Sequence, residues 1–231
     1  MKTSGKNKSR SEGLIRGIPF FASLSAEEFE ELRHMLRERE FPKGTLILSE
    51  EETFQYMYVI LSGKVKVVHF SADGKEHILA IHKRGDYFGE MALLDGKTAP
   101  ATVIAMEDAH LVLIAKEDFD RYLLNNGKVL KQIISMLCVR LRESWMMLRI
   151  LNLPDSEQRV RAVLKMISMQ YGVQDTRGTL ITFKLTHQDI ADYSSVSRET
   201  VTRLVNRLVR DGEVEVLADR NILLKPNFTS C

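Results

Sequence analysis

Cysteine, tryptophan and long apolar runs are all scarce in this chain of 231 residues. Its two cysteines, Cys138 and Cys231, lie far apart and lack the spacing of a zinc or iron–sulfur site. They suggest no disulfide framework, so we expect a reducing cytoplasm. No segment approaches the roughly 20 apolar residues that a membrane-spanning helix needs. The first ten residues are basic and polar, which argues against a signal peptide.

Sequence motifs typical of enzymes are also missing. The chain contains no nucleophile elbow, P-loop, histidine-rich metal motif or convincing pair of catalytic carboxylates. The segment 85–94 superficially resembles a phosphate cradle, but it stands among short strands rather than between a strand and a helix. We therefore expect a binding protein that is not an enzyme, without catalytic residues or a metal site. A net charge of +2 permits a nucleic-acid partner without requiring one.

The most informative segment, residues 185–212, has the pattern of two short helices joined by a tight turn. Thr186 and Asp189 have the spacing of a capping box, and Ser197 is placed to cap the second helix. Four apolar residues spaced by three, one and three positions give that second helix a buried face: Val201, Leu204, Val205 and Leu208. This pattern predicts a helix-turn-helix.

The other face of the second helix carries side chains suited to DNA. Arg198, Glu199 and Arg203 are the candidate base readers, because arginine pairs with guanine and glutamate accepts a hydrogen bond from cytosine. The remaining predicted DNA contacts are Ser197, Thr202, Arg207, Thr186 and Gln188. An ordinary helical hairpin with a solvated basic face is the alternative.

A short hairpin pattern follows the helix-turn-helix. Apolar residues alternate with polar ones on either side of Asp219-Arg220-Asn221: Val214, Val216, Ile222 and Leu224. A helix-turn-helix followed directly by a two-stranded wing is a winged helix.

Upstream, the chain changes from helical to strand periodicity and back. An amphipathic helix is expected over 25–39, and short strands with glycine-containing turns over 41–115. The strands on either side of Asp73-Gly74 are expected to form a hairpin, and the spacing favours an antiparallel barrel or sandwich. A further helix is expected over 157–171.

A long helix after Gly127 carries an apolar seam of alternating steps of four and three. Its members are Leu130, Ile134, Leu137, Leu141, Ser144, Leu148 and Leu151. The seam can pack on its own domain or form a parallel coiled coil with a second copy, which we favour. Leu153-Pro154 breaks the helix and marks the expected domain boundary.

This order of elements resembles the cyclic-AMP receptor protein / fumarate-nitrate regulator (CRP/FNR) family of transcription regulators. The segments GDYFGEMALL at 85–94 and SRETVTR at 197–203 carry the resemblance. It implies an α+β fold: a cyclic-nucleotide-binding-like antiparallel β-roll that senses an effector (18–126), a dimerisation helix (127–153) and a C-terminal winged helix (154–231). The basic, polar N-terminus predicts a disordered arm (1–17) before them.

The resemblance also implies partners. We expect a homodimer through residues 130–151 that binds palindromic double-stranded DNA, with half-sites similar to TGTGA, and that contacts RNA polymerase. An effector bound in the roll would control DNA binding.

The sequence departs from the family at the effector site. Gly89 and Glu90 match the Gly-Glu pair that opens the roll's short helix in the family, where the glutamate contacts the ribose, but Ala99 stands where an arginine would hold a cyclic phosphate. Lys97 does not reproduce the arginine fork. We therefore expect an effector other than cyclic AMP. The predicted effector residues are Gly89, Glu90, Met91, Ala99, Pro100, Ser144 and Trp145. The bulky Trp145 either lines a cavity of different shape or fills the cavity, and we favour filling.

Two alternatives stay open within the same family. The protein is either effector-independent, with the roll as a scaffold, or it senses haem or redox state. No cysteine precedes Cys138, which excludes the family's N-terminal iron–sulfur cluster. The candidate haem ligands are His34, His69, His77, His82, His110 and Cys138, the last of which we expect to be a small core residue.

Overall fold

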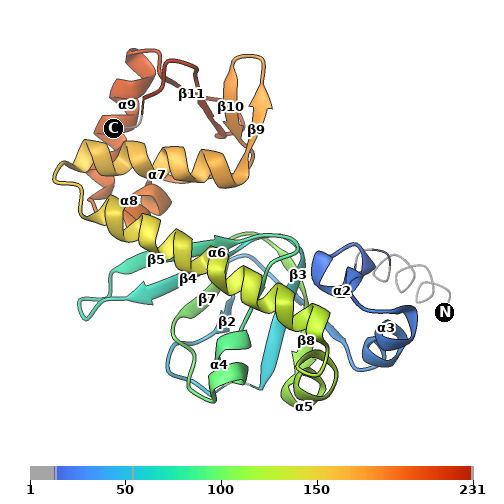
Figure 1. The fold of residues 1–231 in the computed structure, drawn as a ribbon. Coiled ribbons are helices and arrows are strands. Elements are labelled where there is room, and N and C mark those ends of the chain that lie inside the picture. The colour runs from blue at the N-terminus through green and yellow to red at the C-terminus, as the bar shows by residue number, and fades with distance from the viewer. Residues whose placement is uncertain (1–12, 14, 54, 230–231) are drawn as a thin grey trace. The chain divides into compact units, whose positions relative to one another are not determined.

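The computed structural model describes residues 13, 15–53 and 55–229 (Figure 1). They form two compact units joined through one long helix, with the division between Arg140 and Leu141. We expected the boundary at Leu153-Pro154, whereas the division falls inside the helix. Among the described residues, no helix is both long enough and apolar enough to cross a membrane.

The first unit is a β-roll of two four-stranded sheets with antiparallel neighbours, ordered β1–β8–β3–β6 and β2–β7–β4–β5. Its strands are β1 Arg37–Phe41, β2 Leu46–Leu48, β3 Tyr56–Ser62, β4 Val65–Phe70, β5 Glu76–His82, β6 Tyr87–Phe88, β7 Thr102–Ala105 and β8 Ala109–Ala115. The Asp73-Gly74 turn joins the neighbouring strands β4 and β5, which confirms the predicted hairpin.

Strand β3 is a continuous run of apolar residues because both of its faces are covered. Met57 and Val59 belong to one core cluster, which includes residues of the N-terminal helices and of the long helix. Tyr58 and Ile60 point the other way, into the cluster between the two sheets. Because successive side chains alternate between faces, a strand covered on both faces is buried throughout.

Short helices and the first part of one long helix, up to Arg140, complete this unit. They are α2 Pro19–Ala22, α3 Ala26–Arg33, α4 Glu90–Asp95, α5 Lys116–Asp118, the π-helical turn η1 Phe119–Leu123, and α6 Gly127–Leu151. Helix α3 starts with a capping box between Ser25 and Glu28. The prediction that it runs to Arg39 is wrong, because residues 37–41 pair with β8 as a strand.

The predicted disordered arm, residues 1–17, lies largely outside the described residues. Of those described, Gly13, Ile15 and Arg16 are helical, and Ile15 is only 4% exposed, within the core that contains Phe29. The folded unit therefore begins before residue 18, where we placed its start.

The second unit is a winged helix (Figure 1). Its elements are α7 Ser156–Tyr171, β9 Gly172–Asp175, β10 Gly178–Ile181, α8 His187–Ser194, α9 Arg198–Arg210, β11 Val214–Val216 and β12 Ile222–Leu224. The expected wing strands β11 and β12 are present and pair with each other. They belong to a four-stranded sheet, β11–β12–β10–β9, whose other two strands we did not predict.

Candidate DNA-binding and effector sites

Helices α8 and α9 form the predicted helix-turn-helix, and local hydrogen bonds fix both helix starts. The Thr186 N–H donates to Asp189 Oδ2 at 2.8 Å, and the Asp189 N–H donates to Thr186 Oγ1 at 3.1 Å. Ser195 ends α8 in the left-handed conformation, with φ 51°. Ser197 then accepts from the Thr200 N–H at 3.2 Å and starts α9. Thr186 and Ser197 therefore have a structural task as caps.

The two faces of α9 are sharply separated. The four predicted apolar residues are all buried, and Arg198, Glu199 and Arg203 are exposed. Glu199 and Arg203 are one helical turn apart and share a face. Backbone and Ser197 hydrogen bonds, in that order, lower the pKa of the Glu199 carboxyl, so it is an acceptor at neutral pH.

The Thr202 hydroxyl is hydrogen-bonded to two neighbouring residues. Its hydroxyl donates to the Arg198 carbonyl at 2.9 Å, and His187 Nδ1 lies 2.9 Å from the same Oγ1. Since the hydroxyl proton is already used, His187 Nδ1–H is the donor to Thr202. Burial, helped by Arg198, lowers the pKa of His187. This bond connects the first residue of α8 to the recognition helix α9.

Arg207 lies at one end of an ion-pair network that links α7, α9 and the segment before β11. Its guanidinium donates to Glu157, which also accepts from Arg161 Nε at 3.0 Å. The guanidinium of Arg161 donates in turn to both oxygens of Glu213, at 2.6 and 2.8 Å. We expected Arg207 to contact DNA. In the structure its guanidinium is paired with the Glu157 carboxylate.

Gln188, the last predicted DNA contact, lies on the exposed side of α8. Its side-chain amide donates to Asp192 Oδ1 at 2.7 Å. The bond lies within α8, and the side-chain oxygen of Gln188 takes no part in it.

The predicted effector site is a small cavity in the roll. Five predicted residues line it (Gly89, Glu90, Met91, Ala99 and Pro100), and its volume is about 80 Å³. Gly89 adopts φ 84°, and a Cβ there would come within 2.7 Å of the Tyr56 carbonyl oxygen. Only glycine suits this position, because it tolerates both the left-handed backbone and the close approach.

A residue that we did not predict forms the main polar contact of this cavity. Arg140, from α6, donates from one nitrogen to Glu90 Oε1 at 2.5 Å and from another to the Tyr87 carbonyl. The Glu90 side chain is 1% exposed and that of Arg140 is 19% exposed. Burial raises the pKa of the Glu90 carboxyl, and Arg140 opposes that rise. Within the described chain, Glu90 Oε2 has no hydrogen-bond partner.

A signal for Arg140 was present in the sequence. Val129, Ile133 and Arg140 recur at intervals of four and seven, which places the arginine on the buried face of α6. A charged residue on such a face needs a buried partner. Glu90 is that partner, but only the fold brings two residues 50 positions apart together.

The other predicted effector residues do not line the cavity. Ser144 and Trp145 lie on the later part of α6, and Trp145 is 58% exposed. The expectation that Trp145 fills this cavity is therefore not met within a single chain. Lys97 is exposed, and its side chain is not part of the lining.

The candidate haem ligands occupy dissimilar environments. His69 lies 3.0 Å from Glu50, and His110 lies 2.9 Å from Glu38. His82 is buried in the lining of the effector cavity, and burial followed by the Arg140 charge lowers its pKa to about 3. His34 and His77 are respectively exposed and half-buried. Cys138 is exposed in the chain, so the expectation of a core cysteine is wrong.

The apolar seam of α6 is largely uncovered within one chain. Its exposed members are Ile134 (59%), Leu141 (51%), Leu148 (58%) and Leu151 (39%). Leu130 and Leu137 are half-buried, Leu137 against the roll core. A stripe of large apolar side chains open to water is typical of a surface that binds another molecule.

Both units match known domain families. Residues 38–126 match the family described as cyclic nucleotide-binding domain, and residues 158–227 match the Crp-like helix-turn-helix domain. The chain is 30% identical over 203 residues to the cyclic AMP receptor protein of Thermus thermophilus, covering 87% of this chain and 90% of that protein. It is 26% identical over 212 residues to the anaerobic regulatory protein of Bacillus subtilis, covering 90% and 88% of the two chains.

The fold is also shared with a solved structure, that of FixK2 from Bradyrhizobium japonicum. The TM-score is 0.72 at 24% identity, and the match covers 82% of this chain and 92% of that one. The two matched domains, their order and the Thermus relative together show that this chain belongs to the CRP/FNR family of transcription regulators.

Proposed function

We propose that this regulator acts as a homodimer that reads a palindromic operator through one α9 helix per subunit. The observation that carries the proposal is the division of α9: four buried apolar residues anchor it, while Arg198, Glu199 and Arg203 face outward. An anchored helix with exposed arginine and glutamate near its N-terminus has the chemistry for guanine and cytosine edges. Half-sites similar to TGTGA are the operator that the family resemblance suggests.

The dimer is supported by the exposed seam of α6. Ile134, Leu141 and Leu148 recur at seven-residue spacing and are each more than half exposed. A parallel coiled coil of two α6 helices would bury them in a shared seam. It would also provide two recognition helices, as a palindrome requires.

The effector is proposed to differ from cyclic AMP. A cavity of about 80 Å³ falls well below the roughly 300–1,000 Å³ usual for drug-sized ligands. Among the described residues of its lining, Arg140 is the one lysine or arginine, and it is already paired with Glu90. A cyclic phosphate would therefore meet Ala99 and Pro100, and no free guanidinium.

The closed Glu90–Arg140 pair also favours a second candidate, an effector-independent regulator. In that case the ion pair occupies the site that an effector would fill, and the roll serves as a scaffold for the dimer. Contact with RNA polymerase is proposed in either case from the family resemblance alone.

Operator binding by the purified protein tests the DNA-reading proposal. We expect preference for a duplex with two TGTGA half-sites over a scrambled duplex, measured by fluorescence anisotropy at stated salt. Arg198→Ala and Arg203→Ala should each remove most of that preference, since a bidentate arginine–guanine pair contributes about 1–3 kcal/mol of discrimination. Lys165→Ala, an exposed cation on α7, is the charge-matched control and should retain it. Full preference in both arginine variants would refute the assignment.

The same assay separates the two effector candidates. Strong operator binding by protein that retains no small molecule in native mass spectrometry supports the effector-independent form. Binding that needs an added or retained molecule supports effector control.

A further inference from the structure

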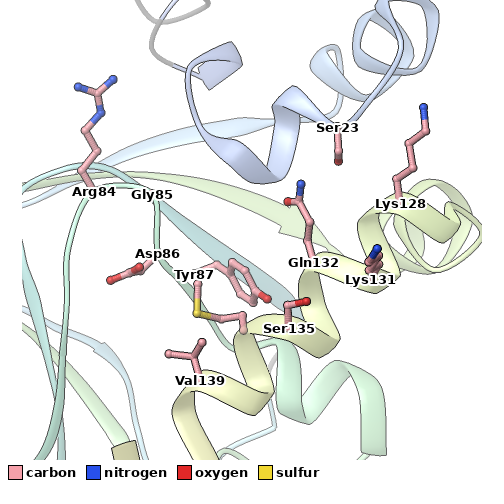
Figure 2. Close-up of a pocket in the computed structure, with 11 residues that line it drawn as sticks. Ser23, Arg84, Gly85, Asp86, Tyr87, Lys128, Lys131, Gln132, Ser135 and Val139 are labelled. Carbon is pink, nitrogen blue, oxygen red and sulfur yellow. The ribbon is translucent and has the colours of Figure 1, made fainter. Parts of the chain in front are cut away.

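A second and larger hollow in the β-roll unit lies outside the effector cavity (Figure 2). We call it the α6 groove. Arg84, Asp86 and Tyr87 line one side, and Lys128, Lys131 and Ser135 of α6 line the other. Its volume is about 620 Å³, which lies within the roughly 300–1,000 Å³ range of small-molecule sites.

Positive charge dominates the groove. Arg84, Lys128 and Lys131 are all exposed, and none of them forms an ion pair with a described residue. Two other lysines of the same unit are paired: Lys64 with Glu107 at 3.0 Å and Lys116 with Asp120 at 2.8 Å. Three unpaired cations around one hollow favour an anionic occupant.

The carboxylate in the lining does not neutralise these cations. Asp86 Oδ2 accepts from the backbone N–H of Lys83 at 2.9 Å and lies 4.0 Å from His82 Nδ1. Its hydrogen bond therefore stabilises the turn at residues 83–86, and it is not spent on a cation of the groove. Burial raises the pKa of the Asp86 carboxyl.

The groove also offers apolar surface between the charges. The Tyr87 ring, Met136 and Val139 belong to the lining, and Val139 is 47% exposed. Figure 2 shows Tyr87 between the Asp86 side of the groove and the α6 side chains. Apolar surface bordered by cations is complementary to an anion that carries an apolar body.

The groove lies on a different face of α6 from the dimerisation seam. Lys128, Lys131, Ser135 and Val139 follow one another at intervals of three or four, so they form one flank of the helix. At about 100° per residue, Val139 lies about 160° around the helix axis from the seam residue Leu141. Pairing through the seam would therefore leave this flank open.

Tyr87 connects the groove to the effector cavity. Its ring lines the groove, its carbonyl accepts a hydrogen bond from Arg140, and the Arg140 guanidinium lies 5.2 Å from the ring centroid. Arg140 in turn holds Glu90. A ligand that shifts the Tyr87 ring would act directly on the ion pair inside the cavity.

We propose that the α6 groove is a second ligand site, which binds a small amphipathic anion such as an aromatic carboxylate, sulfonate or phosphate. The site does not depend on the proposed DNA readout. Binding there can be measured without DNA, so its failure leaves the operator proposal standing.

Titration with anilinonaphthalene sulfonate, an aromatic anion whose fluorescence rises in apolar surroundings, tests the proposal. We expect saturable binding of one probe per chain. Lys128→Gln with Lys131→Gln should weaken it about tenfold, since two partly exposed charge contacts contribute about 0.5–1 kcal/mol each. Ser135→Trp fills the groove without changing its charge and should reduce saturable binding to background.

Matched controls make the result specific. Lys43→Gln with Lys97→Gln removes two exposed lysines elsewhere in the same unit and should leave the dissociation constant unchanged. Circular dichroism verifies that each variant is folded. The proposal is overturned if no saturable site exists, if Ser135→Trp binds as wild type does, or if both lysine pairs weaken binding equally.

Discussion

Arg140 of α6 and Glu90 of the roll form a buried ion pair, with 2.5 Å between the guanidinium and Glu90 Oε1. The pair joins the segment that carries the family's ligand positions to the helix that carries the proposed dimer seam. If α6 moves relative to the roll of the same chain, the Arg140–Glu90 ion pair must either lengthen or move with the helix. It is therefore the part of the roll where ligand binding and α6 position are most directly connected.

Removing the arginine leaves Glu90 as an uncompensated buried charge. Arg140→Met should lower the free energy of unfolding by about 3–5 kcal/mol at pH 7. Without the guanidinium the pKa of Glu90 rises further, so its destabilising effect appears as pH rises through that pKa and is relieved below the ordinary carboxyl range. Urea unfolding at pH 5 and pH 8 measures this; the deficit should be smaller at pH 5.

Restoring neutrality is the control for that variant. Glu90→Gln combined with Arg140→Met should recover part of the loss, because no charge is then buried alone. A double variant no more stable than Arg140→Met would show that the electrostatic explanation is wrong.

His82 should make the roll sensitive to mild acid. Its pKa is about 3 in the folded protein and near 6.5 when unfolded, so the stability it contributes is complete above pH 6.5 and is lost as pH falls toward 3. The loss is about 1.4 kcal/mol per pH unit in that window. His82→Gln should flatten the wild-type slope between pH 6.5 and 5. His69→Gln, at an exposed histidine, should keep it.

We expect the ion pair with Glu157 to keep the Arg207 guanidinium from contacting DNA. Glu157→Gln weakens the ion pair and frees the guanidinium for a phosphate. The slope of log affinity for DNA against log salt should then steepen by about 0.9, the value for one additional phosphate contact. Arg207→Gln should abolish the change when added to Glu157→Gln. An unchanged slope in Glu157→Gln would mean that Arg207 does not reach the backbone.

A charge on the α6 seam should break the dimer, and the same charge on the other flank should not. Leu141→Lys places a cation in the proposed coiled-coil core, whereas Val139→Lys adds it on the side of the α6 groove. Sedimentation velocity should show a monomer for Leu141→Lys and a dimer for Val139→Lys. Two dimers, or two monomers, would contradict the seam assignment.

What could be predicted from sequence was governed by local interactions. The capping pairs Thr186–Asp189 and Ser197–Thr200 join residues three positions apart, so the helix starts of α8 and α9 could be placed correctly. The buried face of α9 follows from the same short-range periodicity.

The errors came from contacts distant in sequence. Residues 37–40 are charged and follow directly on a helical pattern, but pairing with β8, about 70 residues later, makes residues 37–41 a strand. The β9–β10 hairpin carries little apolar alternation and is held by its pairing with β12. The Arg140–Glu90 and Arg207–Glu157 pairs were not foreseen for the same reason, since each joins residues 50 positions apart in the sequence.

Changing the spacing of an operator tests the central proposal most directly. Two subunits that present α9 to successive major grooves require half-sites about one helical turn apart. Inserting about five base pairs, half a turn, between two TGTGA half-sites should lower affinity at least about 100-fold, because one subunit loses its arginine–guanine pairs. An insertion of about ten base pairs should restore the alignment in part. Equal affinity for all three spacings would contradict a dimer that reads two half-sites.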